Sequence, residues 1–147
     1  MALIERAAPP DRADVERLVA AYHASEGVRP RPERISWAVE QVMRNRFPGV
    51  ILVAREKKSV VGVAVATYSV SAELGRVLVV NDFFVDPTLR RKGVGKALAL
   101  RLLEEAKAMR IDRMDLEILP ANEPAAAFWR SLGFRTHGRT IFSRDLT

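Results

Sequence analysis

The sequence has no cysteine and only two histidines, His23 and His137, among its 147 residues. Without thiols the chain can form neither disulfides nor a thiolate metal site, and no cysteine can act as a nucleophile. Two isolated histidines also make a poor ligand set for zinc. We therefore expect no bound metal, and we interpret each histidine as a surface or hydrogen-bonded residue rather than a catalyst.

The sequence also lacks a long apolar run. The longest nearly apolar stretch, residues 60–70, is too short to cross a bilayer and is interrupted by polar groups at 67–69. Near the N-terminus, Glu5 and the pair Pro9 and Pro10 break the unbroken apolar stretch that a secretory signal needs. We therefore expect a soluble, cytoplasmic protein with no membrane partner.

The chain has the length of one domain, and 48% of its residues are hydrophobic, which is enough to form a continuous core. We therefore assign residues 1–147 to a single domain. The formal net charge of +6 favours anionic partners, whether nucleic acid, acidic lipid or a phosphorylated cofactor. The basic residues form no tail or long run, which argues against a nucleic-acid arm. Their densest cluster is Arg90, Arg91 and Lys92.

The first half of the chain predicts a strand, two helices and three further strands. The strand is expected at residues 2–7, and the first helix begins after Asp11 as its N-cap. The second helix is expected at residues 32–46, where a Pro-Gly pair ends it. Apolar residues recur at helical spacing on both helices: Val15, Leu18, Val19 and Tyr22, then Ile35, Val39, Val42 and Met43. Valine-rich strands are expected at residues 50–55, 60–70 and 76–85.

The second half of the chain predicts elements at residues 93–110 (helix), 115–119 (strand), 122–133 (short helix), 134–137 and 140–144 (strands). The long helix joins two strands that we expect to lie parallel in one sheet. The fold class is therefore α/β (α+β), with a mixed, mostly antiparallel central sheet covered by helices. Its predicted order is strand, two helices, three strands, helix, strand, helix and two strands.

Residues 81–98, NDFFVDPTLRRKGVGKAL, place glycines and basic residues where a strand ends and the long helix begins. Such a segment favours a bound phosphate, because glycines allow close approach and the first N–H groups of a helix are unpaired. A P-loop is excluded because Lys96 is followed by alanine, with no glycine five residues before Gly95. A dinucleotide fingerprint is excluded because Leu98 stands where its third glycine belongs.

The same segment resembles the GCN5-related N-acetyltransferase (GNAT) family, whose pattern is matched by Arg90, Gly93 and Gly95. A second family signature is matched by NEPAAAFWRSLGF, residues 122–134. The resemblance implies acetyl-CoA as cosubstrate, with its pyrophosphate held by residues of the basic glycine segment: Arg90, Arg91, Lys92, Gly93, Val94, Gly95 and Lys96. It further implies that the main chain of Phe83, Phe84 and Val85 pairs with the pantetheine arm.

The second signature also implies cofactor contacts for Asn122 and Phe128. Each of these residues has a plain structural interpretation as well. Asn122 is a favoured helix N-cap, and Phe128 lies on the apolar stripe of its helix. Family members commonly have tyrosine where this chain has Trp129, placed to protonate the departing thiolate. An indole donates a hydrogen bond but does not release its proton at ordinary pH, so Tyr22, Tyr68 or water remain alternatives for that role.

The resemblance implies direct transfer of the acetyl group to a primary amine of a small molecule or peptide, with a backbone N–H near Phe84 stabilising the oxyanion. Family members are often homodimers. For the acceptor site we expect Asp82, with Glu26 and Tyr22, to help deprotonate the amine. Because side chains alternate along a strand, we expect Asp82 and Asn81 to face opposite sides. Two other function classes stay open: a CoA-binding sensor with weak catalysis, and a basic nucleic-acid-binding module, although no nucleic-acid recognition motif is present.

Overall fold

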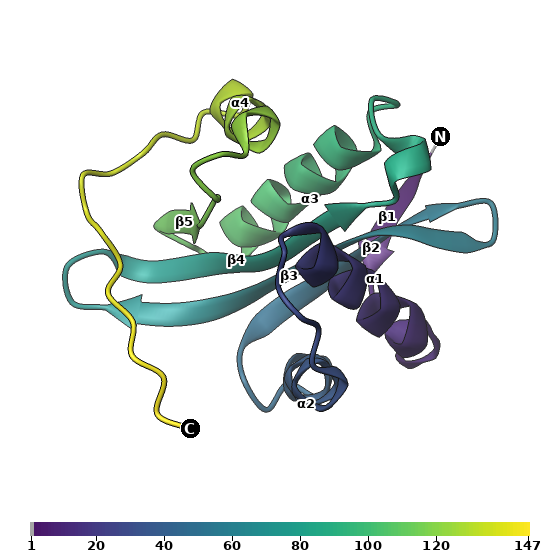
Figure 1. Ribbon diagram of the computed structural model, residues 1–147, viewed down its shortest axis with the longest axis horizontal. Coiled ribbons are helices and arrows are strands. Elements are labelled where there is room, and N and C mark those ends of the chain that lie inside the picture. Colours follow the sequence, from purple (N-terminus) through teal and green to yellow (C-terminus); the bar gives the residue numbers. More distant parts are fainter. Residues whose placement is uncertain (1) are drawn as a thin grey trace. The chain divides into compact units, whose positions relative to one another are not determined.

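The computed structural model describes residues 2–147, which form two compact units, the first ending at Glu117 and the second spanning Ile118–Thr147. The first unit is built on one five-stranded sheet of order β1-β2-β3-β4-β5 (Figure 1). The strands are β1 Leu3–Arg6, β2 Gly49–Glu56, β3 Ser59–Ser71, β4 Gly75–Val85 and β5 Arg113–Leu116. The first four pair antiparallel, and β5 pairs parallel to β4. The predicted mixed, mostly antiparallel sheet is confirmed.

The helices of the first unit are η1 Pro9–Asp11, α1 Arg12–Ser25, α2 Pro32–Met43, η2 Pro87–Leu89 and α3 Val94–Ala108. The second unit contains α4 Glu123–Ser131. The predicted apolar stripes are confirmed on α1 and α2, where Val15, Leu18, Ile35 and Val39 are buried. The two single-turn 3-10 helices were not predicted. Each begins with proline, which fixes φ but is compatible with such a short turn.

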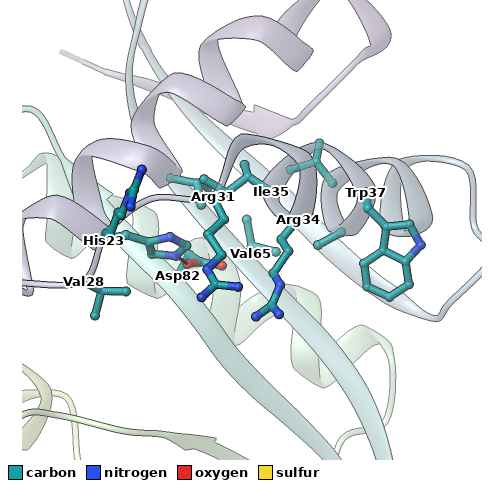
Figure 2. A pocket seen from close by; sticks show the side chains of 12 residues that line it. His23, Val28, Arg31, Arg34, Ile35, Trp37, Val65 and Asp82 are labelled. Atoms are coloured by element: carbon teal, nitrogen blue, oxygen red, sulfur yellow. Dashed lines mark hydrogen bonds and ion pairs between the residues drawn. The ribbon is translucent and has the colours of Figure 1, made fainter. Parts of the chain in front are cut away.

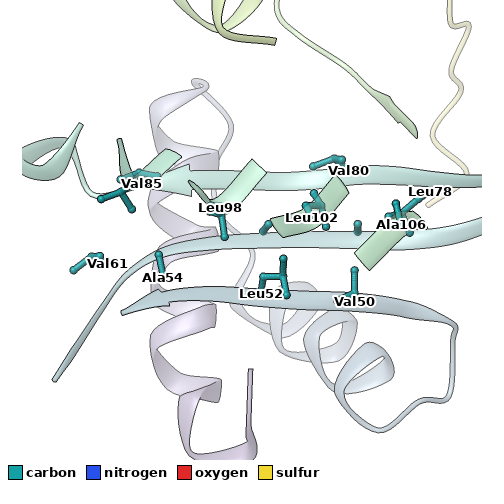
Figure 3. Close-up of a cluster of buried hydrophobic side chains, with 13 residues drawn as sticks. Val50, Leu52, Ala54, Val61, Leu78, Val80, Val85, Leu98, Leu102 and Ala106 are labelled. Atoms are coloured by element: carbon teal, nitrogen blue, oxygen red, sulfur yellow. The ribbon is translucent and has the colours of Figure 1, made fainter. Parts of the chain in front are cut away.

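Two apolar clusters pack on opposite faces of the sheet. One lies between the sheet and α3, and Figure 3 shows Leu52 and Leu78 of the sheet facing Leu98 and Leu102 of α3. The other packs α1 and α2 against the sheet and includes Val53. Leu52 and Val53 are both fully buried although they are neighbours in β2. A strand covered on both faces has no polar side, which explains why β2 is a continuous apolar run.

A β-bulge interrupts the pairing of β3 with β4. Val65 pairs with Asp82 and Ala66 with Val80, so Asn81 is the extra residue. An extra residue shifts the alternation of the strand by one position. Before the bulge, Leu78 and Val80 belong to the cluster under α3.

After the bulge, the residues of β4 that face α3 are odd-numbered, namely Phe83 and Val85. Phe84 therefore belongs to the cluster under α1 and α2, and its neighbour Asp82 lines a cavity on that side. The bulge is thus the feature that keeps the Asp82 carboxylate out of the apolar layer beneath α3.

The expectation that Asn81 and Asp82 face opposite sides is wrong. The amide of Asn81 donates to the hydroxyl of Thr67 at 2.8 Å. Thr67 follows Ala66, which faces α3, so Thr67 lies on the other face. The two residues of a bulge can share one face, and simple alternation fails there.

The two predicted C-terminal strands, residues 134–137 and 140–144, are absent, so the predicted seven-strand order is wrong. Residues 134–147 contain no strand, and Ile141 and Phe142 are 65% and 93% exposed. Their β-favouring residues predicted a hairpin. A two-stranded hairpin that buries little apolar surface is at most marginally stable, however, so β propensity alone does not fix one.

Asp11 precedes α1 as predicted, but its carboxylate does not cap that helix. It accepts hydrogen bonds from the Ala8 N–H at 2.8 Å and from two guanidinium nitrogens of Arg55 at 3.0 and 3.1 Å. Arg55 also binds Glu5 at 2.8 Å. Asp11 is only 6% exposed. The carboxylate therefore fixes the start of α1 to β2 rather than satisfying the first turn of α1.

We expect Asp11→Asn to lower the free energy of unfolding by about 2 kcal/mol at neutral pH, because it removes a buried charge-assisted pair. The Arg55 guanidinium lowers the pKa of Asp11 below its ordinary value of 3.8. The pair's contribution is therefore present above pH 3.8 and is lost as the pH falls through the lowered pKa. Urea unfolding at several pH values measures this. Asp14→Asn, which breaks an exposed pair with Arg17, is the matched control and should cost under about 0.5 kcal/mol.

Candidate active site

The end of β4 extends past its neighbour β5. The parallel pairs run from Val77 with Arg113 to Val80 with Leu116, whereas β4 continues to Val85. Residues 82–85 thus pair with β3 on one side, while the β5 pairing has already ended on the other. A strand that continues past its neighbour is a place where an extended ligand can pair. This is the segment whose main chain the family resemblance predicts to pair with the pantetheine arm.

The turn between β4 and α3 is held at its first residue. The Asp86 carboxylate accepts from the Thr88 N–H at 3.0 Å and from its hydroxyl at 2.8 Å, and these bonds lower the pKa of Asp86. The chain then passes through η2. Arg91, with φ of 68°, and Gly93, with φ of 82°, both adopt the left-handed conformation before α3 begins. Such a turn directs successive N–H groups to one side.

The start of α3 has the geometry of an anion site. Ala97 N–H donates to Gly93 C=O at 3.0 Å, so the N–H groups of Val94, Gly95 and Lys96 precede the regular helical bonds. A Cβ placed on Gly93 would meet no atom within 4 Å, so the space beside the glycine is open. The Val94 side chain is buried in the apolar cluster between α3 and the sheet, which leaves its N–H as the group that could contact a ligand.

The basic residues of this segment divide into two groups. Arg91, Lys92 and Lys96 are exposed beside the turn. Arg90 instead folds back on β4: its Nε donates to the Val85 carbonyl at 3.1 Å, and its guanidinium lies 5.1 Å from the centre of the Phe84 ring. The pyrophosphate contact predicted for Arg90 stays a prediction.

A cavity of about 510 Å³ lies between α1, α2 and the sheet, on the face opposite α3 (Figure 2). Its apolar wall comes from all three of these elements. It is lined by Val19, His23, Val28, Arg29, Arg31, Arg34, Ile35, Trp37, Ala38, Val39, Val65 and Asp82. Its volume suits a small molecule.

Asp82 and His23 form the polar pair of this cavity. His23 Nε2 lies 2.7 Å from Asp82 Oδ1, and the Asp82 side chain is 14% exposed. Burial raises the pKa of Asp82 above 3.8, and the hydrogen bond and charge of His23 partly oppose that rise. Asp82 therefore lines a cavity, and both its place in an acceptor site and its catalytic role stay predictions.

His23 is hydrogen-bonded, as predicted, but the sequence did not show that its partner is Asp82 or that both residues line a cavity. It follows Val15 and Val19 at four-residue spacing, which continues the buried stripe of α1. That spacing is the signal from which an inward-facing ring could have been predicted. Its partner Asp82 lies 59 residues away, so only the fold brings the two side chains together.

Tyr22 and Glu26 contact each other rather than Asp82. The Tyr22 hydroxyl donates to Glu26 at 3.3 Å, and the ring packs 6.3 Å from that of Phe84 and 5.9 Å from that of His23. Burial, reinforced by the Glu26 carboxylate, raises the pKa of Tyr22 to about 12. The phenol therefore keeps its proton at neutral pH.

In the second unit, several residues of the 122–134 motif have structural roles within the unit itself. The Asn122 side chain accepts from the Ala125 N–H at 3.2 Å, so Asn122 is the N-cap of α4, as predicted. Trp129 is 6% exposed, and its ring meets those of Phe128 and Phe134 edge-on, at 5.0 and 5.1 Å. The cofactor contacts predicted for Asn122 and Phe128, and the role of Trp129, stay predictions.

Residues 2–147 lack two features that mark other classes of protein. No group of three or more His, Asp or Glu residues in this range is arranged to hold a metal ion. None of the helices in the same range is long and apolar enough to cross a membrane.

The sequence matches the acetyltransferase (GNAT) family over residues 14–134. It is 30% identical over 121 residues to a mycothiol acetyltransferase of Segniliparus rotundus, covering 75% of this chain and 44% of that protein. It is 37% identical over 62 residues to a glucosamine 6-phosphate N-acetyltransferase of Trypanosoma brucei brucei, covering 42% of this chain and 40% of that one. The chain thus spans less than half the length of these curated relatives.

Solved structures show the same fold. A possible acetyltransferase from Clostridium difficile superposes with a TM-score of 0.85 at 20% identity, covering 100% of this chain and 99% of that one. An aminoglycoside N-acetyltransferase in complex with CoA superposes with a TM-score of 0.82 at 18% identity, covering 100% and 96%. At such identities the likeness concerns the fold alone.

Proposed function

The chain belongs to the acetyltransferase (GNAT) family, and from that premise we propose that it transfers the acetyl group of acetyl-CoA directly to a primary amine. The observation that carries the proposal is the end of β4 beside the start of α3. There an open glycine turn, free helical N–H groups and three exposed basic side chains follow a strand end that extends past its neighbour. These groups fit a pyrophosphate and an extended arm.

Acetyl-CoA supplies an activated thioester. The residues of this chain would bind acetyl-CoA and accept the proton that the amine loses. The N–H groups of residues 94–96, with Arg91, Lys92 and Lys96, would hold the pyrophosphate. The backbone of Phe83, Phe84 and Val85 would hold the arm. The reaction forms one carbon–nitrogen bond, breaks one carbon–sulfur bond, and moves one proton from the amine while the released thiolate takes up another.

The His23–Asp82 pair is the proposed acceptor of the amine proton. An alkylamine with a pKa of about 10.4 is almost wholly protonated at neutral pH. Forming the neutral, nucleophilic amine at pH 7 therefore costs about 4.6 kcal/mol. When His23 donates its Nε2–H to Asp82, the neutral ring keeps Nδ1 as its basic atom. Asp82 orients the ring and stabilises its charged form. This pair replaces the predicted set of Asp82, Glu26 and Tyr22.

The proposal is tested by acetyl-CoA-dependent thiol release with a panel of small amines and short peptides, together with the melting temperature. Acetyl-CoA should raise the melting temperature because it binds the folded chain. Thiol release should then require an amine. A rise in melting temperature with no thiol release from any amine would favour the CoA-binding sensor. No effect of acetyl-CoA on either measurement would refute the proposal.

We expect Trp129→Phe to change the maximal rate by less than about 5-fold, because phenylalanine keeps the edge-on packing with Phe128 and Phe134 and an indole is not a proton source. Initial rates at saturating acetyl-CoA measure this. The unfolding midpoint and CoA affinity are recorded for the same variant. A rate loss of about 100-fold or more with both of these unchanged would show that the indole takes part in the reaction.

A further inference from the structure

Three arginines line the candidate acceptor cavity: Arg29, Arg31 and Arg34. All three are exposed. Other arginines of this region are paired, as Arg12 is with Glu16 and Glu40. Among residues 2–147, no ion pair or side-chain hydrogen bond involves any of the three. Their charge is therefore available to a ligand.

The local sequence holds these arginines at the cavity. Arg31 has an extended conformation, φ −118° and ψ 98°, as expected for the residue before Pro32, the first residue of α2. Arg34 lies in the first turn of α2, and its N–H donates to the Arg31 carbonyl at 3.1 Å, so the two residues are held close together. Figure 2 shows their guanidinium ends pointing in the same direction, with His23 and Asp82 to one side.

The lining of the cavity contains two chemically different polar groups. Asp82 is the only carboxylate among its lining residues, and its partner is His23. The remaining lining is apolar apart from the three arginines. An amine bound at His23 and Asp82 would therefore share one cavity with an apolar wall and with the guanidinium groups.

We propose that the acceptor is a small amine that also carries a carboxylate or phosphate group, which the arginines bind. This inference rests on the proposed function. Guanidinium groups bind both anions through charge-assisted hydrogen bonds. They repel amines with a second positive charge, which disfavours polyamine acceptors. The same positive field favours the neutral form of the reacting amine, which is the nucleophilic form.

The test uses pairs of amines that differ in one group. The carboxylate arm compares 4-aminobutanoate with 4-aminobutanamide, and the phosphate arm compares glucosamine 6-phosphate with glucosamine. The dication 1,4-diaminobutane is the cationic probe. Calorimetry with CoA present measures binding, and thiol release from acetyl-CoA measures transfer. We expect at least one anionic probe to bind about 10-fold or more tightly than its neutral partner, and the dication to bind more weakly than either.

The double variant R31Q/R34Q removes two of the charges from exposed positions, so the fold should survive. We expect it to reduce the preference for the anionic probe to within about 2-fold. Arg46→Gln is the matched control, because Arg46 is exposed just beyond the other end of α2 and does not line the cavity. The control should keep the wild-type preference. Arg34→Glu should reverse it in favour of 1,4-diaminobutane.

Equal binding of both members in each pair, or a preference that survives in R31Q/R34Q, would overturn the inference. The failure of the proposed function gives a different result. If the anionic probe binds through the arginines but no amine supports thiol release, the anion site stands and the acetyl transfer does not. If neutral amines are acetylated as efficiently as their anionic partners, the acetyl transfer stands and the anion site does not.

Discussion

A valine at position 93 should weaken CoA binding by at least about 100-fold while the chain remains folded. Gly93 has a φ of 82°, and the space beside it is open, so no neighbouring atom would clash with a side chain there. A branched side chain would occupy the space that a phosphate needs to reach the N–H groups of residues 94–96. The left-handed φ adds a folding cost of about 1–2 kcal/mol for a β-branched residue. Calorimetry with CoA and urea unfolding separate the two effects.

Gly27→Val is the matched control for this experiment. Gly27 has a φ of 75°, and a Cβ there would also meet nothing within 4 Å. The variant should therefore lose a similar folding free energy. It lies in the loop after α1, away from the glycine turn, so its CoA affinity should stay within about 2-fold of the wild type. Unchanged CoA affinity in a folded Gly93→Val variant would reject the pyrophosphate site.

Asp82→Asn should lower the turnover rate by about 100-fold at neutral pH and by less at high pH, where more of the amine is already neutral. Asparagine keeps the shape of the side chain but cannot stabilise a protonated His23. The full pH-rate profile of both proteins, measured at saturating acetyl-CoA, checks this. Profiles that differ by one constant factor at every pH would show that the proton leaves by another route.

The same substitution should affect stability much less than activity. Burial raises the pKa of Asp82, so the folded chain binds its proton more tightly than the unfolded chain does. This group therefore contributes most stability below pH 3.8, and that contribution is lost as the pH rises through the raised pKa. At neutral pH the variant replaces the charge-assisted hydrogen bond from His23 with a neutral one, but it also avoids burying a charge.

Glu26→Gln is the control that separates the predicted acceptor groups. It makes the same change from carboxylate to amide, at the partner of Tyr22 rather than of His23. The turnover rate and its pH dependence should stay close to those of the wild type. A loss at neutral pH in Glu26→Gln with none in Asp82→Asn would transfer the role of base to the Tyr22 and Glu26 pair.

The central strands could be predicted from the sequence because their signals are local. The valine-rich runs placed β2, β3 and β4 within one residue of their observed ends, and the apolar spacing placed α1. The glycine turn before α3 was also a local signal, since backbone freedom at Gly93 needs no partner elsewhere. The parallel pairing of β4 with β5 followed from the helix between them.

The remaining features depend on contacts between distant residues. The His23 and Asp82 pair joins α1 to β4, and the bulge at Asn81 exists only when β3 and β4 are paired. Asp11 looked like a helix cap because its true partner, Arg55, is 44 residues away. The C-terminal strands were predicted from β propensity alone, which does not show whether a neighbouring strand is present.

The bulge also determines which single-residue deletion β4 can tolerate. Because Asn81 opposes no residue of β3, its removal would join the two halves of β4 in continuous alternation and leave each remaining side chain on its present face. Deletion of a paired residue such as Val79 would instead move the side chains on one side of the deletion to the opposite face of the sheet. The bulge lies next to Val80, where β4 and β5 stop pairing, and bulges bend strands. A chain without Asn81 would keep the carboxylate of Asp82 in its cavity, but β4 would be straighter where it continues past β5. The deletion would therefore leave the proposed acceptor site in place and change the geometry of the proposed cofactor site.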